Sequence, residues 1–113
     1  AMNPLNFFAV PTSPLSRESC EDLWRQGSLR VERIISSDTP DPCLYDQDQD
    51  EWVMLLEGRA VLEVAGERVD LSPGDFLAIP AHTQHRVLET HPGPRCLWLA
   101  VHCYPATPSR PQA

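Results

Sequence analysis

The sequence predicts an all-β fold, and three observations carry this prediction. Short apolar segments recur at regular spacing along the chain. Several of them alternate apolar and polar residues, as half-buried strands do. Groups of Gly, Pro, Asp and Ser separate them, as turns between strands require. We therefore expect a sandwich or barrel of short strands, at residues 29–36, 52–57, 59–65, 68–71, 76–79, 85–88 and 97–104.

One short helix is expected before the first strand. Ser16 or Ser19 is a suitable N-cap, acidic residues follow in the first turn, and Gly27 suits the C-terminal end. The expected helix runs through residues 21–24. No other helical pattern follows, so an alternating α/β architecture is not expected.

Glycines mark three expected turns. Gly58 ends the apolar run 52–57 and is expected to form a hairpin turn between two strands. Gly66 is expected to form a second hairpin turn. Pro73 and Gly74 stand in the positions that a type II turn favours, so a third turn is expected there.

Length and composition predict one domain. A chain of 113 residues with 42% hydrophobic residues is large enough for a single hydrophobic core. Many of the 12 prolines lie near the two ends, where they favour extended segments. The expected organisation is an N-terminal arm (residues 1–16), a β-domain (residues 17–104) and a proline-rich C-terminal tail (residues 105–113).

Charge and cysteine usage exclude several classes of function. The net charge is −7 and no basic run occurs, which disfavours a nucleic-acid partner. No stretch of 18 apolar residues occurs, so no membrane span is expected. The four cysteines form no CxxC pair and the start lacks a basic export signal, which predicts reduced thiols and a cytoplasmic protein.

The segment 45–86 carries a spaced set of residues that points to a family. Glu51 is followed by Gly58 after six residues, and Gly74 is followed by Pro80 after five, with His85 shortly beyond. This spacing resembles the two sequence motifs of the cupin superfamily, small single-domain members in particular. The resemblance implies a double-stranded β-helix, or jelly-roll, barrel with a site inside it.

The same resemblance suggests metal ligands. Glu51 and His85 fall on two ligand positions of the cupin motifs, whereas Tyr45 and Gln47 stand where histidines are usual. It therefore implies a divalent transition metal such as Fe, Mn, Ni or Zn, held by Glu51, His85 and the amide of Gln47. Such ions favour imidazole ligands, so a metal-free pocket in which Glu51 and His85 pair with each other is an equal alternative.

The acidic stretch before Glu51 supports an inward direction for two of these side chains. Asp46, Asp48 and Asp50 alternate with glutamines. If the stretch is a strand, the aspartates face solvent, and Gln47 and Glu51 face the interior. A calcium-binding loop is disfavoured, because its glycine and spaced terminal glutamate are missing.

Two histidines and a tryptophan complete the expected pocket. Trp98 and His102 share a strand face with the small Ala100, which suits the wall of a cavity. We expect His102 to reach the cavity and to supplement the ligands or bind substrate; an outer face or a subunit contact is the alternative. His82 is expected on the turn at the mouth, with a solvent-facing side chain as the alternative. Tyr45 and Trp98 would shape the pocket.

These residues leave two main functions open and assign no catalytic residue. The first is a metal-dependent enzyme acting on a small molecule, of the dioxygenase, isomerase or decarboxylase class. The second is a metal-free ligand-binding or regulatory cupin; a purely structural barrel is a third. In each case a small molecule or a second copy of the chain is the expected partner. A homodimer is expected, with Phe7 and Phe8 of the arm as candidate contacts.

Overall fold

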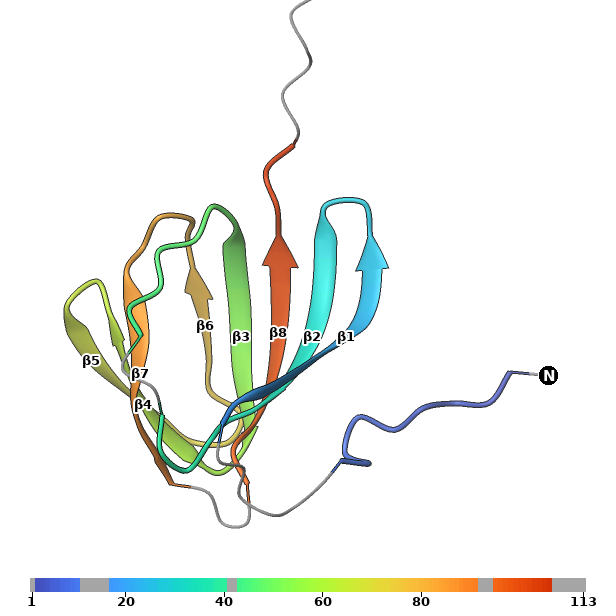
Figure 1. Ribbon diagram of the computed structural model, residues 1–113, viewed down its shortest axis with the longest axis horizontal. Coiled ribbons are helices and arrows are strands. Elements are labelled where there is room, and N and C mark those ends of the chain that lie inside the picture. Colours follow the sequence, from blue (N-terminus) through green and yellow to red (C-terminus); the bar gives the residue numbers. More distant parts are fainter. Residues whose placement is uncertain (1, 11–16, 41–42, 92–94, 107–113) are drawn as a thin grey trace, which may run out of the picture.

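The computed structural model describes residues 2–10, 17–40, 43–91 and 95–106. In these residues all the regular secondary structure is β-strand. Two antiparallel sheets, ordered β1-β2-β8-β3-β6 and β5-β4-β7, enclose the core (Figure 1). This confirms the expected all-β jelly roll. No helix long and apolar enough to cross a membrane occurs in the described part. The strands are β1 (Ser19–Gln26), β2 (Leu29–Ile35), β3 (Asp50–Glu57), β4 (Arg59–Val64), β5 (Glu67–Leu71), β6 (Phe76–Ile79), β7 (His85–His91) and β8 (Leu97–Cys103).

The helix expected at residues 21–24 is wrong, because these residues belong to β1. This strand pairs with β2 along its length, from Ser19 opposite Ile35 to Gln26 opposite Leu29. Gly27, with a φ of 57°, allows the tight turn between them. A helix of so few residues is marginal in water without an apolar face to bury. The edge of β2 instead satisfies the backbone groups of this exposed segment.

The hairpin expected at Gly58 is also wrong, because β3 and β4 lie in different sheets. The chain crosses from one sheet to the other at this residue. Its φ is +84°, and an added Cβ would lie 2.6 Å from Sγ of Cys96 and 2.7 Å from the carbonyl oxygen of Arg95. Glycine is therefore needed at Gly58 both for its backbone conformation and for the close approach of the chain that leads into β8.

The other two expected turns are present. β4 and β5 form an antiparallel hairpin around Ala65 and Gly66, which have φ values of 50° and 81°. Two successive positive φ values are typical of the hairpin turn whose twist matches that of its strands. At the third turn Gly74 has a φ of 94°, and the amide of Asp75 donates to the carbonyl of Ser72 at 2.9 Å, as in a type II turn.

The register of the larger sheet sorts its inward side chains into rows. β8 lies between β2 and β3, so each inward residue of β8 has a register partner on both sides. The row nearest the β1–β2 turn is polar, the next is mixed, and the third is apolar. From the first row to the third, these are Arg30, His102 and Glu51; Glu32, Ala100 and Val53; and Ile34, Trp98 and Leu55.

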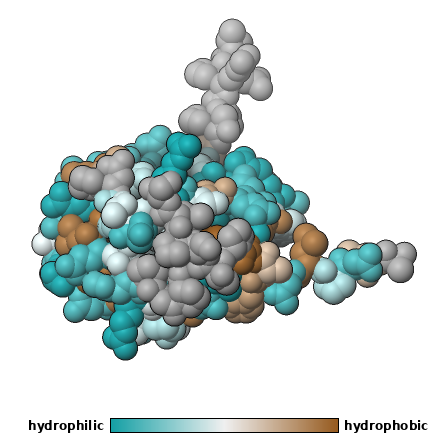
Figure 2. Space-filling view, turned by 60° about the horizontal axis from the view of Figure 1, so that its bottom comes forward, coloured by the Kyte–Doolittle hydropathy of each residue, from teal (hydrophilic) through white to brown (hydrophobic). Residues whose placement is uncertain are grey.

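Two arginines hold the part of the N-terminal arm that the structure describes. Arg33 donates to the carbonyl of Phe7 at 3.0 Å, and its guanidinium lies 5.7 Å from the centre of that ring. Arg95 donates to the carbonyls of Val10 at 2.9 Å and Phe8 at 3.2 Å and also pairs with Glu57. In Figure 2 the hydrophobic residues on this side of the molecule form separate patches among hydrophilic ones. The expected tail beyond residue 106 lies outside the described residues.

The Gly58→Ala substitution should destabilise the fold strongly. It adds left-handed strain, about 1–2 kcal/mol, and a clash that overpacking data put at about 1–3 kcal/mol. Gly66→Ala is the matched control, since its φ of +81° is similar but nothing lies within 4 Å of the added Cβ. Chemical unfolding should show a loss for Gly58→Ala that exceeds the control by more than about 1 kcal/mol. Equal losses would contradict the close approach at Gly58.

Candidate functional site

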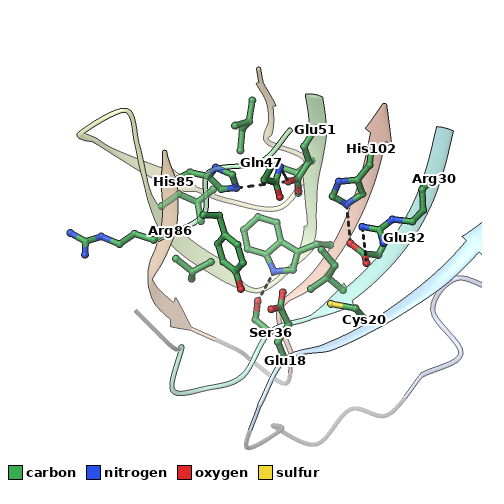
Figure 3. A pocket seen from close by; sticks show the side chains of 17 residues that line it. Glu18, Cys20, Arg30, Glu32, Ser36, Gln47, Glu51, His85, Arg86 and His102 are labelled. Carbon is green, nitrogen blue, oxygen red and sulfur yellow. Dashed lines mark hydrogen bonds and ion pairs between the residues drawn. The ribbon is translucent and has the colours of Figure 1, made fainter. Parts of the chain in front are cut away.

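A cavity of about 220 Å³ lies between the two sheets (Figure 3). Pockets for drug-sized ligands are typically about 300–1,000 Å³, so this cavity suits a smaller molecule. Its walls combine the polar row of the larger sheet with residues from β7 and from the loop before β3. The lining residues are Glu18, Cys20, Arg30, Glu32, Ile34, Ser36, Tyr45, Gln47, Glu51, Val53, Leu62, Ile79, His85, Arg86, Val87, Trp98 and His102.

Glu51 and His85 face each other across the cavity from opposite sheets. Oε1 of Glu51 lies 3.9 Å from Nε2 of His85, and each residue is only 9% exposed. The other ring nitrogen of His85, Nδ1, lies 2.9 Å from the carbonyl oxygen of Thr83. A carbonyl only accepts, so Nδ1 carries a proton and donates it. In the neutral ring the lone pair of Nε2 is therefore left facing Glu51 and the cavity.

The loop before β3 brings Gln47 to this pair. The stretch before Glu51 is mostly a loop, so the condition for its strand alternation is not met: β3 begins at Asp50, and Tyr45 makes only an isolated bridge with His85. The carbonyl of Gln47 accepts from the amide of His82 at 2.7 Å, which anchors the loop. The side-chain Nε2 of Gln47 donates to Oε1 of Glu51 at 3.1 Å. Gln47 reaches the cavity from a loop because this backbone contact orients it.

The turn between β6 and β7 fixes the position of His85. Two backbone amides of this turn bond to the chain around the start of β3. The amide of His82 donates to Gln47, as above, and the amide of Ala81 donates to Oδ1 of Asp50 at 2.8 Å. His82 has a φ of 61°, an unusual conformation for a residue with a side chain. Its ring is exposed and lies 3.4 Å from Oδ1 of Asp46, away from the residues that line the cavity. His82 lies on the expected turn and its side chain faces solvent, which is the alternative that the sequence left open beside a role in the pocket.

Tyr45 covers one side of His85. The two residues exchange backbone hydrogen bonds of 2.8 and 3.0 Å, and their rings stack with centres 5.8 Å apart. Stacking limits the rotation of the imidazole. Tyr45 lines the cavity, as the sequence predicts, and is positioned to hold the ring of His85 in place.

A second histidine–carboxylate pair lines the cavity on the larger sheet. Nε2 of His102 lies 3.0 Å from Oε1 of Glu32, and the two residues are 4% and 7% exposed. Nδ1 of His102 lies 3.3 Å from Nε2 of Gln49. His102 therefore reaches the cavity but is committed to Glu32. The sequence reading missed Glu32, although the alternation of residues 29–36 places it on the same strand face as Arg30.

The floor of the cavity is formed by the apolar ring of Trp98. The indole Nε1 of Trp98 donates to Oγ of Ser36 at 2.7 Å, and Trp98 is only 3% exposed. This bond satisfies the one polar atom of the buried ring. Trp98 therefore shapes the cavity, as the sequence predicts, with its polar atom already paired.

Glu18 and Cys20 lie at the rim, where the site has an excess of acidic groups. Burial, followed by the charges of Glu32 and Glu51, raises the pKa of Glu18 above its ordinary value. Partial burial at the cavity rim and the neighbouring Glu18 raise the pKa of Cys20 to about 12. The Cys20 thiol is therefore protonated at neutral pH and is a poor nucleophile.

Glu51, His85 and Gln47 carry side chains of the types that bind divalent ions. The described residues hold no group of three or more His, Cys, Asp or Glu side chains that suits a metal. Glu51 offers a carboxylate, and His85 offers a lone pair on Nε2 because Nδ1 is occupied. The amide of Gln47 donates its Nε2 to Glu51, so its oxygen would act as a weaker ligand only after the amide group turns over. This set would bind a transition metal less tightly than a site with several imidazoles.

Comparisons with known proteins relate this chain to a family and to solved structures. The family model described as Cupin domain matches residues 37–102. A crystal structure from Ralstonia eutropha JMP134, provisionally named a mannose-6-phosphate isomerase, is 39% identical, with a TM-score of 0.82, over 92% of this chain and 100% of that one.

Two more distant structures share the fold. A cupin superfamily protein from Desulfitobacterium hafniense DCB-2 has a TM-score of 0.74 at 20% identity and covers 93% of this chain and 94% of its own. KdgF from Halomonas sp. has a TM-score of 0.66 at 19% identity, over 79% of this chain and 81% of its own. No protein with a curated description matches the sequence.

The Glu18→Gln substitution should raise stability at neutral pH and not at low pH. A raised pKa means that the folded state holds this proton more tightly than the unfolded state does. The associated stability is fully present below the ordinary glutamate pKa of about 4.3 and is lost as the pH rises through the folded pKa. The glutamine variant avoids that loss, so its melting temperature should exceed the wild-type value at pH 7 and match it near pH 3.5.

Thermal unfolding followed by circular dichroism checks this expectation. Glu67→Gln, on the exposed hairpin between β4 and β5, is the control for the loss of one negative charge. The same pH dependence in both variants would contradict a specific effect of the cavity on Glu18.

Proposed function

Because this chain belongs to the cupin family, we propose that it binds a small, oxygen-rich molecule in its cavity and converts it by acid–base chemistry of the isomerase class. The observation that carries this proposal is the pair of Glu51 and His85, buried, facing each other from opposite sheets, with Nε2 of His85 turned to the cavity. Acid–base catalysis requires such a group within reach of the ligand.

The distances suit proton transfer to and from a bound ligand. At 3.9 Å, Glu51 and His85 do not hydrogen bond directly, so a ligand hydroxyl can contact both. Neutral His85 accepts a proton through Nε2 while the carbonyl of Thr83 holds Nδ1–H. The carboxylate of Glu51, oriented by Gln47, stabilises the resulting imidazolium. Return of the proton to a neighbouring ligand atom completes an isomerisation without an added oxidant.

The similar proteins support this class of reaction. The Ralstonia protein, which covers almost the whole chain at 39% identity, carries the provisional name of a sugar-phosphate isomerase. A sugar or sugar derivative is small and rich in hydroxyl groups, which matches the size of the cavity and its polar row. We therefore place the substrate among sugars and their acidic derivatives.

A divalent metal is an alternative use of the same residues, because an ion on Nε2 of His85 would occupy the lone pair that otherwise accepts the proton. Glu51, His85 and Gln47 would hold Fe, Mn, Ni or Zn. When bound, such an ion supplies a Lewis acid that polarises an oxygen of the ligand. His102 stays paired with Glu32 and would contact substrate rather than the ion.

A second candidate function is ligand binding without catalysis. It is favoured by Tyr45 and Gln47, which stand where cupin motifs usually carry histidines. In this case the cavity would be metal-free and the protein would have a regulatory or carrier role. Binding of a sugar without turnover, with or without added metal, would support this second function over the first.

Metal content of the purified protein tests the ligand set. We expect metal in the wild type, measured by plasma mass spectrometry after loading with Fe, Mn, Ni or Zn, and its loss in a Glu51→Ala/His85→Ala variant. Glu89→Ala/His91→Ala is the matched control, since this exposed pair has a similar separation of 3.8 Å. No metal in the wild type would favour metal-free function, and retention in the Glu51/His85 variant would contradict the proposed ligands.

The homodimer and the cytoplasmic location stay predictions from the sequence. In the structure, Phe8 is 49% exposed, and the ring of Phe7 lies against Arg33. We propose that a second copy covers exposed apolar side chains of this kind. Light scattering should give twice the mass of one chain, and a monomer mass at micromolar concentration would contradict the dimer.

A further inference from the structure

Arg30 brings into the cavity a guanidinium group without a hydrogen bond to any described residue. Its Nε is buried and has no partner. The nearest carboxylate oxygens belong to Asp22, 3.7 Å from Nε, and Glu32, 3.7 Å from Nη2. Hydrogen bonds of this kind are about 2.7–3.2 Å long. The two carboxylates therefore attract the cation without satisfying its donors.

The position of this guanidinium is nevertheless fixed. It lies over the ring of Tyr104, 5.6 Å from its centre, and its side chain is only 22% exposed. In Figure 3, Arg30 extends from β2 toward Glu32 and His102. A planar donor group held in place before a ligand arrives loses little entropy on binding.

The second cation of the cavity is already satisfied. Arg86 places both Nε and Nη2 3.1 Å from Oε1 of Glu63. Its charge and the donors on this edge of the guanidinium are therefore committed to a carboxylate of the protein. Arg30 differs because its nearest oxygens are too distant to accept hydrogen bonds.

The acidic groups near Arg30 do not exclude an anion. Nε2 of His102 donates a hydrogen bond to Oε1 of Glu32 at 3.0 Å, so this carboxylate is already engaged by a donor of the protein. Burial and the charges of Glu32 and Glu51 make Glu18 hold its proton to a higher pH than an ordinary glutamate. An incoming carboxylate or phosphate thus meets Glu32 as a group already bonded to His102, while the donors of Arg30 stay open to it.

We infer that Arg30 binds an anionic group of the ligand, a carboxylate or a phosphate, at the opposite end of the polar row from Glu51. Because Arg30, His102 and Glu51 are register partners on three adjacent strands, Arg30 and Glu51 are two strand spacings apart, or about 10 Å. The substrate would therefore carry its anion several bonds from the reacting atoms, as a hexuronic acid or a hexose 6-phosphate does. This inference rests on the proposed function.

Paired ligands with and without an anionic group test the inference. Calorimetric titrations would compare galactose with galacturonate, and mannose with mannose 6-phosphate, for the wild type, Arg30→Gln, Arg30→Lys and Arg86→Gln. We expect the wild type to bind at least one anionic ligand about tenfold or more tightly than its neutral partner, as a charged two-donor contact allows. Arg30→Gln should abolish that preference, Arg30→Lys should keep part of it, and Arg86→Gln should keep it.

The outcomes separate the two proposals. Equal binding of neutral and anionic partners by the wild type would overturn the role of Arg30 and leave the sugar site standing. A preference that survives Arg30→Gln would also overturn it, and so would an equal loss in Arg86→Gln, which would indicate a general charge effect. If none of the four sugars binds, the inference fails together with the proposed function. A preference for only galacturonate or only mannose 6-phosphate would identify the anion as carboxylate or phosphate.

Discussion

The pairing of β8 with both β2 and β3 is the constraint on which the site depends. These two ladders place residues of three distant sequence segments in common rows, and they fix which side chains point inward. A shift of one residue in β8 would turn His102 and Trp98 outward and bring Val101 and Leu99 into the cavity. The polar row, the apolar floor and the core therefore follow from one register.

One end of these strands is apolar and supports stability, whereas the other end carries the polar groups of the site. Leu55, Trp98 and Ala100 lie at or near complete burial and fill the closed end together with residues of the smaller sheet. The polar row lies at the other end, where its charged groups pair within the cavity. Buried ion pairs contribute little net stability, so the apolar end must support the groups that bind the ligand.

The sequence predicts the fold better than it predicts the site. Turn chemistry and alternation locate seven of the strands, and the jelly roll follows from motif spacing. β1 is missed because its acids and Gly27 also suit a helix, and only the free edge of β2 decides between the two. The crossing at Gly58 is missed because a glycine between two strands signals a turn without saying which sheet follows.

At the site, the resemblance to the cupin motifs points to Glu51, His85 and Gln47, and the structure places all three along the cavity. Trp98 and His102 follow from the two-residue period of a strand. Neither signal shows that Thr83 fixes the imidazole of His85 or that His102 is paired with Glu32. These contacts join residues that only the folded register brings together.

The close approach at Gly58 also makes the reactivity of the Cys96 thiol depend on the intact fold. This thiol is fully buried beneath the crossing, and burial raises its pKa, so it is shielded from alkylating reagents on two counts. Cys43 and Cys103 are exposed. Their thiols report the reactivity of the folded surface, whereas modification of Cys96 requires the chain around the crossing to open. The rate at which Cys96 reacts would therefore measure opening of the barrel without any added label.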